Sequence, residues 1–226
     1  QALFLTSSFM FDSAETGANL FAGTAEGYTY SRTANPTINA FEQRVAHLEQ
    51  AERGLATATG MAALQATFLT FLQAGDHLVS SSSLFGTTMG LISNQLPRCG
   101  IEVTLVSQTD LAQWQAAIKD NTKMLFLETP SNPLNEAGDI SALAKMAHEA
   151  GALLVVDNSV CSPALQRPLS LGADLSVQSA TKAIDGHGRV MGGIVCGSDT
   201  LIDQVFQHAR TAGQSMSPFN AWVLLS

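Results

Sequence analysis

The sequence predicts an α/β fold with a mostly parallel, seven-stranded open sheet and helices on both of its faces. Apolar segments of strand length alternate with segments in which apolar residues recur every three or four positions. The run at 153–156, Leu-Leu-Val-Val, contains no polar residue, as in a parallel strand that is covered on both faces. The strands are expected at 54–58, 77–80, 101–106, 124–127, 153–156, 174–177 and 194–196.

Helices are expected between the strands, where capping residues precede the apolar periodicity. Asn39 and Glu42 are spaced like a capping box, which predicts a helix that begins there. Gly60 opens the next helix, and a glycine at that position lets an anion approach the free N–H groups of the first turn. Two more helices are expected after Asp110 and Asp139.

Composition and charge narrow the classes of function. The chain has 226 residues, 46% of them hydrophobic, which suits one α/β domain with a large core, or one domain and part of a second. The net charge is -8 without a basic cluster, so neither nucleic acid nor an anionic membrane is an expected partner. No apolar run reaches about 18 residues, so no membrane span is expected. Cys99, Cys161 and Cys196 lack the spacing of metal ligands, which predicts reduced thiols in a cytoplasmic protein without a metal site.

The two ends of the sequence have their own expectations. Residues 1–27 are rich in Ser, Thr, Gly and Phe and show no sustained period, so we expect an extended arm with loops that packs on a partner subunit. The sequence stops at Ser226, inside the apolar run 221–225. A domain rarely ends in such a run, and further chain is therefore expected after it.

Polar groups follow three of the expected strands: Asn132, Asp157 and Lys182. Ligands of open parallel sheets bind beyond the carboxyl ends of the strands. Burying a carboxylate there is costly unless it has a partner, and a protonated ring nitrogen would be one. A lysine that forms a Schiff base and an aspartate that pairs with a pyridinium are the groups that pyridoxal-phosphate chemistry needs. The alternative for Lys182 is an ordinary loop lysine that faces water.

Several further residues are candidates for binding such a cofactor. The expected donors to its phosphate are the hydroxyl groups of Ser179 and Thr181 and the N–H groups of Gly60 and Met61. Phe85 follows a strand end and either stacks on a planar ligand or belongs to the core. Arg32, close to Tyr30, either binds an anion or lies in a surface loop.

Six short stretches match a known family in order and spacing, across nearly the whole chain. They are Y-S-R-T-A-N-P-T at 30–37, T-G-M-A-A at 59–63, L-F-G-T-T at 84–88, E-T-P-S-N-P at 128–133, V-D-N at 156–158 and S-A-T-K at 179–182. On these stretches the chain resembles the Cys/Met metabolism family of pyridoxal-phosphate enzymes. The resemblance implies the aspartate-aminotransferase-like fold (fold type I), pyridoxal 5'-phosphate as cofactor and a small amino-acid substrate.

The resemblance also implies roles for the candidate residues. Lys182 would bind the cofactor as a Schiff base and move protons, Asp157 would pair with the pyridine nitrogen, and Asn132 would lie near the phenolic oxygen of the ring. Tyr30 and Arg32 would reach the phosphate of the neighbouring subunit. A homodimer with shared active sites is therefore implied, and a homotetramer is expected.

The same resemblance divides the chain. Residues 1–37 would form an arm that contacts the partner subunit, and residues 38–226 would form the large domain that binds pyridoxal phosphate. A small C-terminal domain would lie outside this sequence.

Phe85 departs from the pattern of many members, which have tyrosine there. Stacking on the ring survives, but any proton step of the missing hydroxyl group would fall to Lys182 or Tyr30. With D-G-H-G-R-V-M-G-G at 185–193 and S-P-F-N-A-W at 217–222, Phe85 is most similar to one branch of the family. That branch joins an O-acylated homoserine to sulfide and makes homocysteine, in methionine biosynthesis.

Three alternatives stay open. The same cofactor could serve a cystathionine γ-synthase or a γ-lyase. Ser179 and Lys182 also match the S-x-x-K motif of penicillin-binding proteins, but no K-T-G follows in the chain. Finally, the chain could be a truncated relative that binds the cofactor without turnover.

Overall fold

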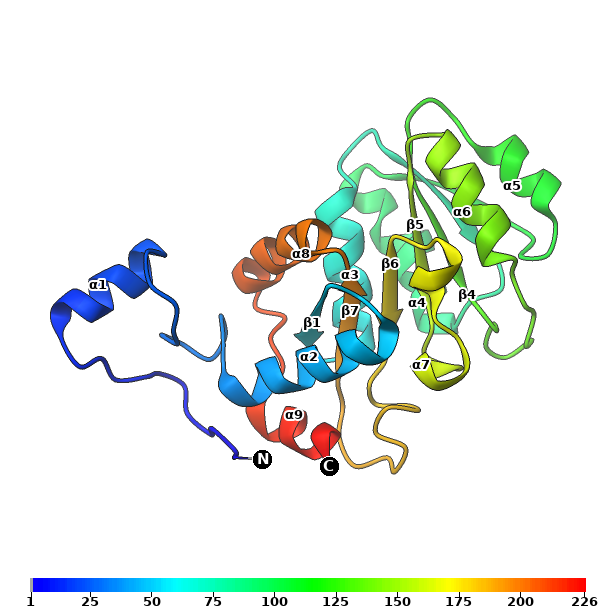
Figure 1. Ribbon diagram of the computed structural model, residues 1–226. Coiled ribbons are helices and arrows are strands. Elements are labelled where there is room, and N and C mark those ends of the chain that lie inside the picture. Colours follow the sequence, from blue (N-terminus) through cyan, green and yellow to red (C-terminus); the bar gives the residue numbers. More distant parts are fainter. Residues whose placement is uncertain (1) are drawn as a thin grey trace.

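The computed structural model, which describes residues 2–226, contains a seven-stranded sheet between layers of helices, with an N-terminal arm that extends away from it (Figure 1). The strand order is β1-β7-β6-β5-β4-β2-β3. The strands are β1 (Arg53–Thr57), β2 (His77–Ser81), β3 (Glu102–Val106), β4 (Thr122–Glu128), β5 (Leu153–Asp157), β6 (Leu175–Gln178) and β7 (Gly193–Gly197). The α/β class and the seven predicted strands are confirmed.

One strand, β7, makes the sheet mixed. It runs antiparallel to both of its neighbours, β1 and β6, whereas β2 to β6 pair in parallel. The chain between β6 and β7 is a loop without a helix, whereas the crossover between two parallel strands usually contains one. The other six strands share one direction, so the prediction of a mostly parallel sheet is confirmed.

Helices cover both faces of the sheet, and an apolar core lies between the sheet and the helices on each face. The helices are α1 (Ala14–Ala22), α2 (Pro36–Glu49), α3 (Gly60–Phe71), α4 (Gly86–Gly90), η1 (Leu91–Gln95), η2 (Pro97–Cys99), α5 (Leu111–Ala117), α6 (Ile140–Glu149), α7 (Ser162–Leu165), η3 (Pro168–Leu171), α8 (Asp199–Ala212) and α9 (Pro218–Leu225). Successive strand residues point to opposite faces. Phe126 accordingly packs with α3 and α8, and Leu125 packs with α5 and α6 on the other face, where Ile194 meets α2 and α9.

The arm differs from its prediction, because residues 14–22 form the helix α1 rather than a loop. The hydroxyl group of Ser13 accepts a hydrogen bond from the Thr16 N–H (3.1 Å), and Gly23 ends the helix with a φ of 72°. Met10 is 98% exposed and Phe21 is 75% exposed. Single apolar side chains are common on protein surfaces, so this exposure does not test the contact with a partner subunit, which stays a prediction.

Helix α2 begins four residues before its predicted start, so the capping box at Asn39 is wrong. Asn35 caps the helix through its side-chain oxygen, which accepts from the Thr37 N–H at 2.9 Å. Pro36 occupies the first helical position, where its missing N–H costs nothing. Glu42 instead reaches β1, where its carboxyl group accepts from the Ala56 N–H at 2.8 Å.

Glu42 should make the stability of the fold depend on pH. Burial raises the pKa of its carboxyl group from 4.5 to about 7, although the bond from Ala56 and the charge of Arg53 lower it. Between these values the folded chain keeps a proton that the unfolded chain has released, so the free energy of unfolding should fall as pH rises from about 4.5 to about 7. We expect a loss on the order of 1–3 kcal/mol, which Glu42→Gln should reduce in urea unfolding at several pH values.

The control for this prediction is Glu149→Gln on the exposed surface of α6. It should leave the pH dependence as it is in the natural protein. An undiminished pH dependence in the Glu42→Gln variant would contradict the assignment.

Gly193, at the start of β7, lets two distant backbones meet. A Cβ atom there would lie 2.2 Å from the carbonyl oxygen of Thr59 and 2.7 Å from the nitrogen of Gly60. Neither backbone atom can rotate away, so Gly193→Ala should lower the free energy of unfolding by at least about 1–3 kcal/mol. Gly90→Ala is the matched control, since nothing lies within 4 Å of its added Cβ, and it should be neutral or slightly stabilising in the same urea unfolding.

Candidate active site

A pocket of about 530 Å³ opens at the carboxyl ends of β4, β5 and β6. Parallel strands end at a common edge, so the polar residues that follow them are neighbours in space although they are far apart in the sequence. The pocket brings together most of the predicted site residues. Those that line it are Gly60, Met61, Phe85, Asn132, Asp157, Ser179, Thr181 and Lys182.

Lys182 stands in the tight turn that follows β6. Its N–H donates to the Ser179 carbonyl at 3.1 Å, and its own carbonyl accepts from the Gly186 N–H at 2.8 Å. Asp185 holds the chain just after this turn. Its buried carboxylate accepts hydrogen bonds from the N–H (2.6 Å) and the side-chain Nε (2.9 Å) of Arg189. The turn thus presents the Lys182 amine to the pocket from a fixed backbone.

Asp157 is a buried acid at the end of β5. Burial raises the pKa of its carboxyl group, opposed by hydrogen bonds from the hydroxyl group (2.6 Å) and the N–H (3.0 Å) of Ser159. Both bonds fall on the Oδ1 atom. No ion pair of Asp157 occurs within residues 2–226. A buried carboxylate in this state favours a cationic or N–H partner in the pocket.

The start of α3 packs directly against Ser179. A Cβ atom on Gly60 would lie 2.7 Å from the Ser179 Cβ, so only glycine permits this approach. The N–H groups of Gly60 and Met61 belong to the first turn of the helix and have no acceptor within it. They are free to bind an anion, in the favourable field of the helix dipole.

Thr181 lines the pocket but already uses its hydroxyl group. The Oγ1 atom donates to the Gly192 carbonyl at 3.2 Å and accepts from the Gly192 N–H at 3.0 Å. To donate to an anion, this hydroxyl group would have to exchange the first of these bonds.

Four polar residues of the pocket escaped the sequence prediction: Thr59, Thr88, Glu128 and Ser159. Glu128 ends β4 as Asp157 ends β5, and the two residues are register partners. Burial, together with the charge of Asp157, raises the pKa of Glu128 from 4.5 to about 7, although backbone hydrogen bonds from Phe85 and Asn132 lower it. An acid that ends an apolar strand was the available signal, and it is the same signal that pointed to Asp157.

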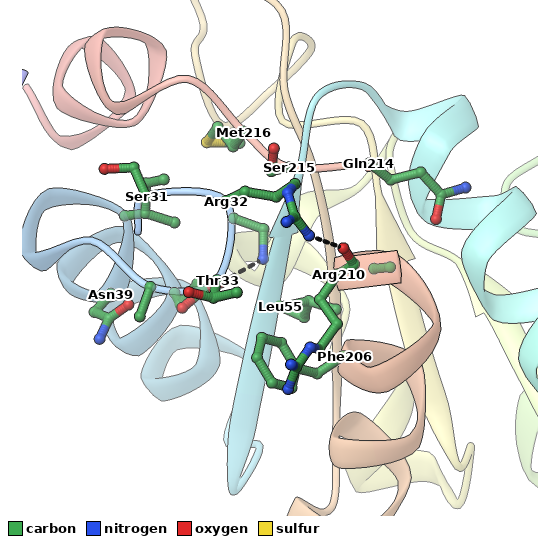
Figure 2. A pocket seen from close by; sticks show the side chains of 15 residues that line it. Ser31, Arg32, Thr33, Asn39, Leu55, Phe206, Arg210, Gln214, Ser215 and Met216 are labelled. Atoms are coloured by element: carbon green, nitrogen blue, oxygen red, sulfur yellow. Dashed lines mark hydrogen bonds between the residues drawn. The ribbon is translucent and has the colours of Figure 1, made fainter. Parts of the chain in front are cut away.

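Tyr30 and Arg32 do not line this pocket. Arg32 donates to the Arg210 carbonyl, and its guanidinium group lies 5.5 Å from the centre of the Tyr30 ring. Figure 2 shows Arg32 beside Arg210 and Phe206, at a separate cavity of about 30 Å³. Within one chain the structure therefore keeps these two residues apart from Lys182, and their predicted place at a neighbouring subunit's site stays a prediction.

Comparisons with known proteins identify the family. A family model described as "Cys/Met metabolism PLP-dependent enzyme" matches residues 1–226. The chain belongs to this family. It is 52% identical over 225 residues to the O-succinylhomoserine sulfhydrylase of Pseudomonas aeruginosa, with 100% of this chain and 56% of the relative covered. It is 45% identical over 204 residues to an L-methionine gamma-lyase of Fusobacterium nucleatum subsp. polymorphum, covering 90% of this chain and 52% of the relative.

Two solved structures share the fold of this chain. Cystathionine gamma-lyase from Lactobacillus plantarum, complexed with L-serine, superimposes with a TM-score of 0.92 at 35% identity. Cystathionine gamma synthase from Xanthomonas oryzae pv. oryzae gives a TM-score of 0.93 at 34% identity. Each comparison covers 99% of this chain and 56% of the solved chain, so the chain spans about half the length of the relatives it matches.

The pocket suits the cofactor of the Cys/Met metabolism family, pyridoxal phosphate. Asp157 is a buried carboxylate whose cost a protonated ring nitrogen would offset. The close approach of Gly60 to Ser179 leaves N–H and hydroxyl donors for a phosphate, and Lys182 supplies an amine for the aldehyde carbon. The residues present therefore fit the group.

Proposed function

We propose that this chain carries the cofactor site of an O-succinylhomoserine sulfhydrylase. The reaction replaces the acyloxy group at Cγ of O-succinylhomoserine with sulfide, so that a C–O bond breaks, a C–S bond forms, and homocysteine and succinate leave. The observation that supports a pyridoxal-phosphate reaction is the meeting of the Lys182 amine and the buried Asp157 carboxylate in one pocket. Identities of 52% and 45% to sulfhydrylases favour this branch.

The residues of the pocket would divide the work. When bound, pyridoxal phosphate supplies an acceptor for the electrons left at the substrate's Cα. Lys182 binds the cofactor and, when its amine is free, holds or moves the proton of Cα. Asp157 would keep the ring nitrogen protonated, and Asn132 would hold the ring on the side of its phenolic oxygen. The phosphate would be held by Gly60, Met61, Ser179 and Thr181.

Phe85 would stack on the ring without adding a proton-transfer group. Phe85 is 45% exposed, which leaves its ring accessible to the flat face of a ligand bound in the pocket. Proton steps that a tyrosine could serve at this position would fall to Lys182 or Tyr30.

The quaternary arrangement belongs to the same proposal. Residues 1–37 would reach over a partner subunit, and residues 38–226 would form the large domain. Tyr30 and Arg32 would then complete the phosphate site of the partner in a homodimer, with a homotetramer as the expected assembly.

Cys99, Cys161 and Cys196 are free thiols, which suits a cytoplasmic protein. The described residues include no helix long and apolar enough to cross a membrane.

The test is a comparison of products in the full natural protein. O-Succinylhomoserine with sulfide should give homocysteine faster than the same donor with cysteine gives cystathionine. Borohydride reduction should add the mass of the cofactor to Lys182. Cystathionine as the dominant product would overturn the sulfhydrylase proposal, and bound cofactor without any turnover would support a non-catalytic relative.

A methionine γ-lyase is the second candidate, favoured by the 45% identity to the Fusobacterium enzyme. Such an enzyme eliminates instead of replacing, so methionine and water, without a second substrate, would give a volatile thiol and a 2-oxo acid, with the amino group released as ammonia. The proposal expects little of either product.

A further inference from the structure

Glu128 is an unusual residue for its place. The preceding residues of β4, Met124 to Leu127, are apolar and fully buried, and Glu128 is itself only 3% exposed. Its neighbour in register on β5 is the buried acid Asp157. Two neighbouring buried carboxyl groups oppose each other's ionisation and are costly to maintain. Because burying this carboxyl group destabilises the fold, we look for a contact of Glu128 that an apolar side chain could not make.

The contacts of Glu128 point to two residues that face the pocket. Its Oε2 atom accepts from the Phe85 N–H at 2.6 Å. The backbone of Asn132 is directed to the same carboxyl group and lowers its pKa, as does the bond from Phe85. Phe85 comes from the start of α4 and Asn132 from the loop after β4, so one side chain joins two segments that are otherwise separate.

The Phe85 end of this link depends most on Glu128. Phe85 stands at the N-cap of α4, where no side chain caps the helix. The Asn132 loop has anchors of its own, since the Ser131 N–H donates to the Glu136 carbonyl at 3.0 Å and the Gly138 N–H to the Thr129 hydroxyl group at 2.9 Å. Loss of the acceptor would therefore release Phe85 first.

We propose that Glu128 is a positioning residue of the cofactor site, whose carboxyl group fixes the backbone at Phe85 and Asn132 and so sets where these two side chains stand against the ring. Glu128 acts through its neighbours and has no assigned contact with the reacting atoms. The inference rests on the proposed placement of pyridoxal phosphate beside Lys182.

The experiment compares Glu128→Gln with Glu128→Ala in the full natural protein. Glutamine keeps an oxygen that can accept from Phe85, whereas alanine leaves that N–H without a partner. The dissociation constant of pyridoxal phosphate should stay within about threefold for Glu128→Gln and should rise about tenfold or more for Glu128→Ala. The circular dichroism of the bound cofactor, which reports how the ring is held, should be retained with glutamine and should fall by about half or more with alanine.

Glu42 supplies the matched control. It is another acid whose pKa burial raises to about 7, and it accepts one backbone N–H, but it does not line the pocket. Glu42→Ala and Glu42→Gln should leave both cofactor readouts unchanged. Equal damage from Glu42→Ala and Glu128→Ala would mean a general loss of stability and would overturn the inference.

Two other outcomes would also overturn the inference. In the first, the Glu128→Ala variant binds pyridoxal phosphate with the affinity and the circular dichroism of the natural protein. In the second, the Glu128→Gln variant is as impaired in both readouts as the Glu128→Ala variant. If the alanine variant does not fold, Glu128→Asp decides, because it keeps the charge and draws the acceptor back by one methylene. The dissociation constant of pyridoxal phosphate should rise about threefold or more in the Glu128→Asp variant, and an unchanged value contradicts the inference.

The borohydride product separates this inference from the proposed function. A cofactor adduct on Lys182, with unchanged readouts in the Glu128 variants, contradicts only the role of Glu128. Absence of the adduct in the natural protein contradicts the placement of the cofactor itself.

Discussion

Replacing Lys182 with alanine is expected to lower turnover by at least about 10³-fold, because it removes both the amine that binds the cofactor and the group that moves the Cα proton. The variant should also lose the adduct that borohydride fixes. The measurements are the rate of homocysteine formation, and the mass of the peptide that contains residue 182 after reduction.

Lys145→Ala is the control for this change. Lys145 is exposed on α6 and, among residues 2–226, its only ion pair is a long contact of 3.9 Å with Glu149, so its loss should be nearly neutral for stability and activity. Full turnover and an unchanged cofactor spectrum in the Lys182→Ala variant would exclude Lys182 as the cofactor-binding lysine.

Replacing Asp157 with asparagine should separate function from stability. The substitution removes the charge that would keep the ring nitrogen protonated, so turnover should fall by about 10²–10³-fold. It also removes a buried acid whose pKa burial raises, and such an acid destabilises the folded state above its ordinary pKa. The cofactor-free variant should therefore unfold at the same temperature as the natural protein or at a higher one.

Thermal unfolding of the cofactor-free protein and the rate of homocysteine formation together check this prediction. An asparagine variant that keeps its activity would show that the ring nitrogen has no need of a carboxylate. A variant that loses both activity and cofactor-free stability would assign Asp157 to the fold rather than to the site.

The parts of the fold that were predictable are those with a local signal. The apolar run at 153–156 and the polar residue after it were enough to place β5 and Asp157 at one edge of the sheet. Lys182 was predictable for the same reason, since it follows the short strand β6. Helix α1 was missed because its nine residues carry no sustained apolar period, and only the caps Ser13 and Gly23 mark it.

Other parts of the site depend on contacts that no local pattern carries. Glu128 looks like the first residue of the loop E-T-P-S-N-P, and its role emerges only when β4 and β5 lie side by side. The start of α2 is a different case, because the cap Asn35 and Pro36 at the first helical position are a local signal, whereas the prediction placed the cap at Asn39. The place of Tyr30 and Arg32 depends on a second subunit, which neither the sequence nor one chain contains.

The pairing of β1 also sets an order of events during synthesis. β1 joins the sheet through β7 alone, with Arg53 opposite Gly197, and the start of α3 rests on Gly193 and Ser179. Contacts between residues so distant along the chain form late, because the entropy cost of closing a long loop comes before the contacts can stabilise the fold. A nascent chain must therefore keep its early apolar segments from aggregating until β7 has left the ribosome. The cofactor site would be complete only after β1 and β7, the first and last strands of this sheet in chain order, have paired.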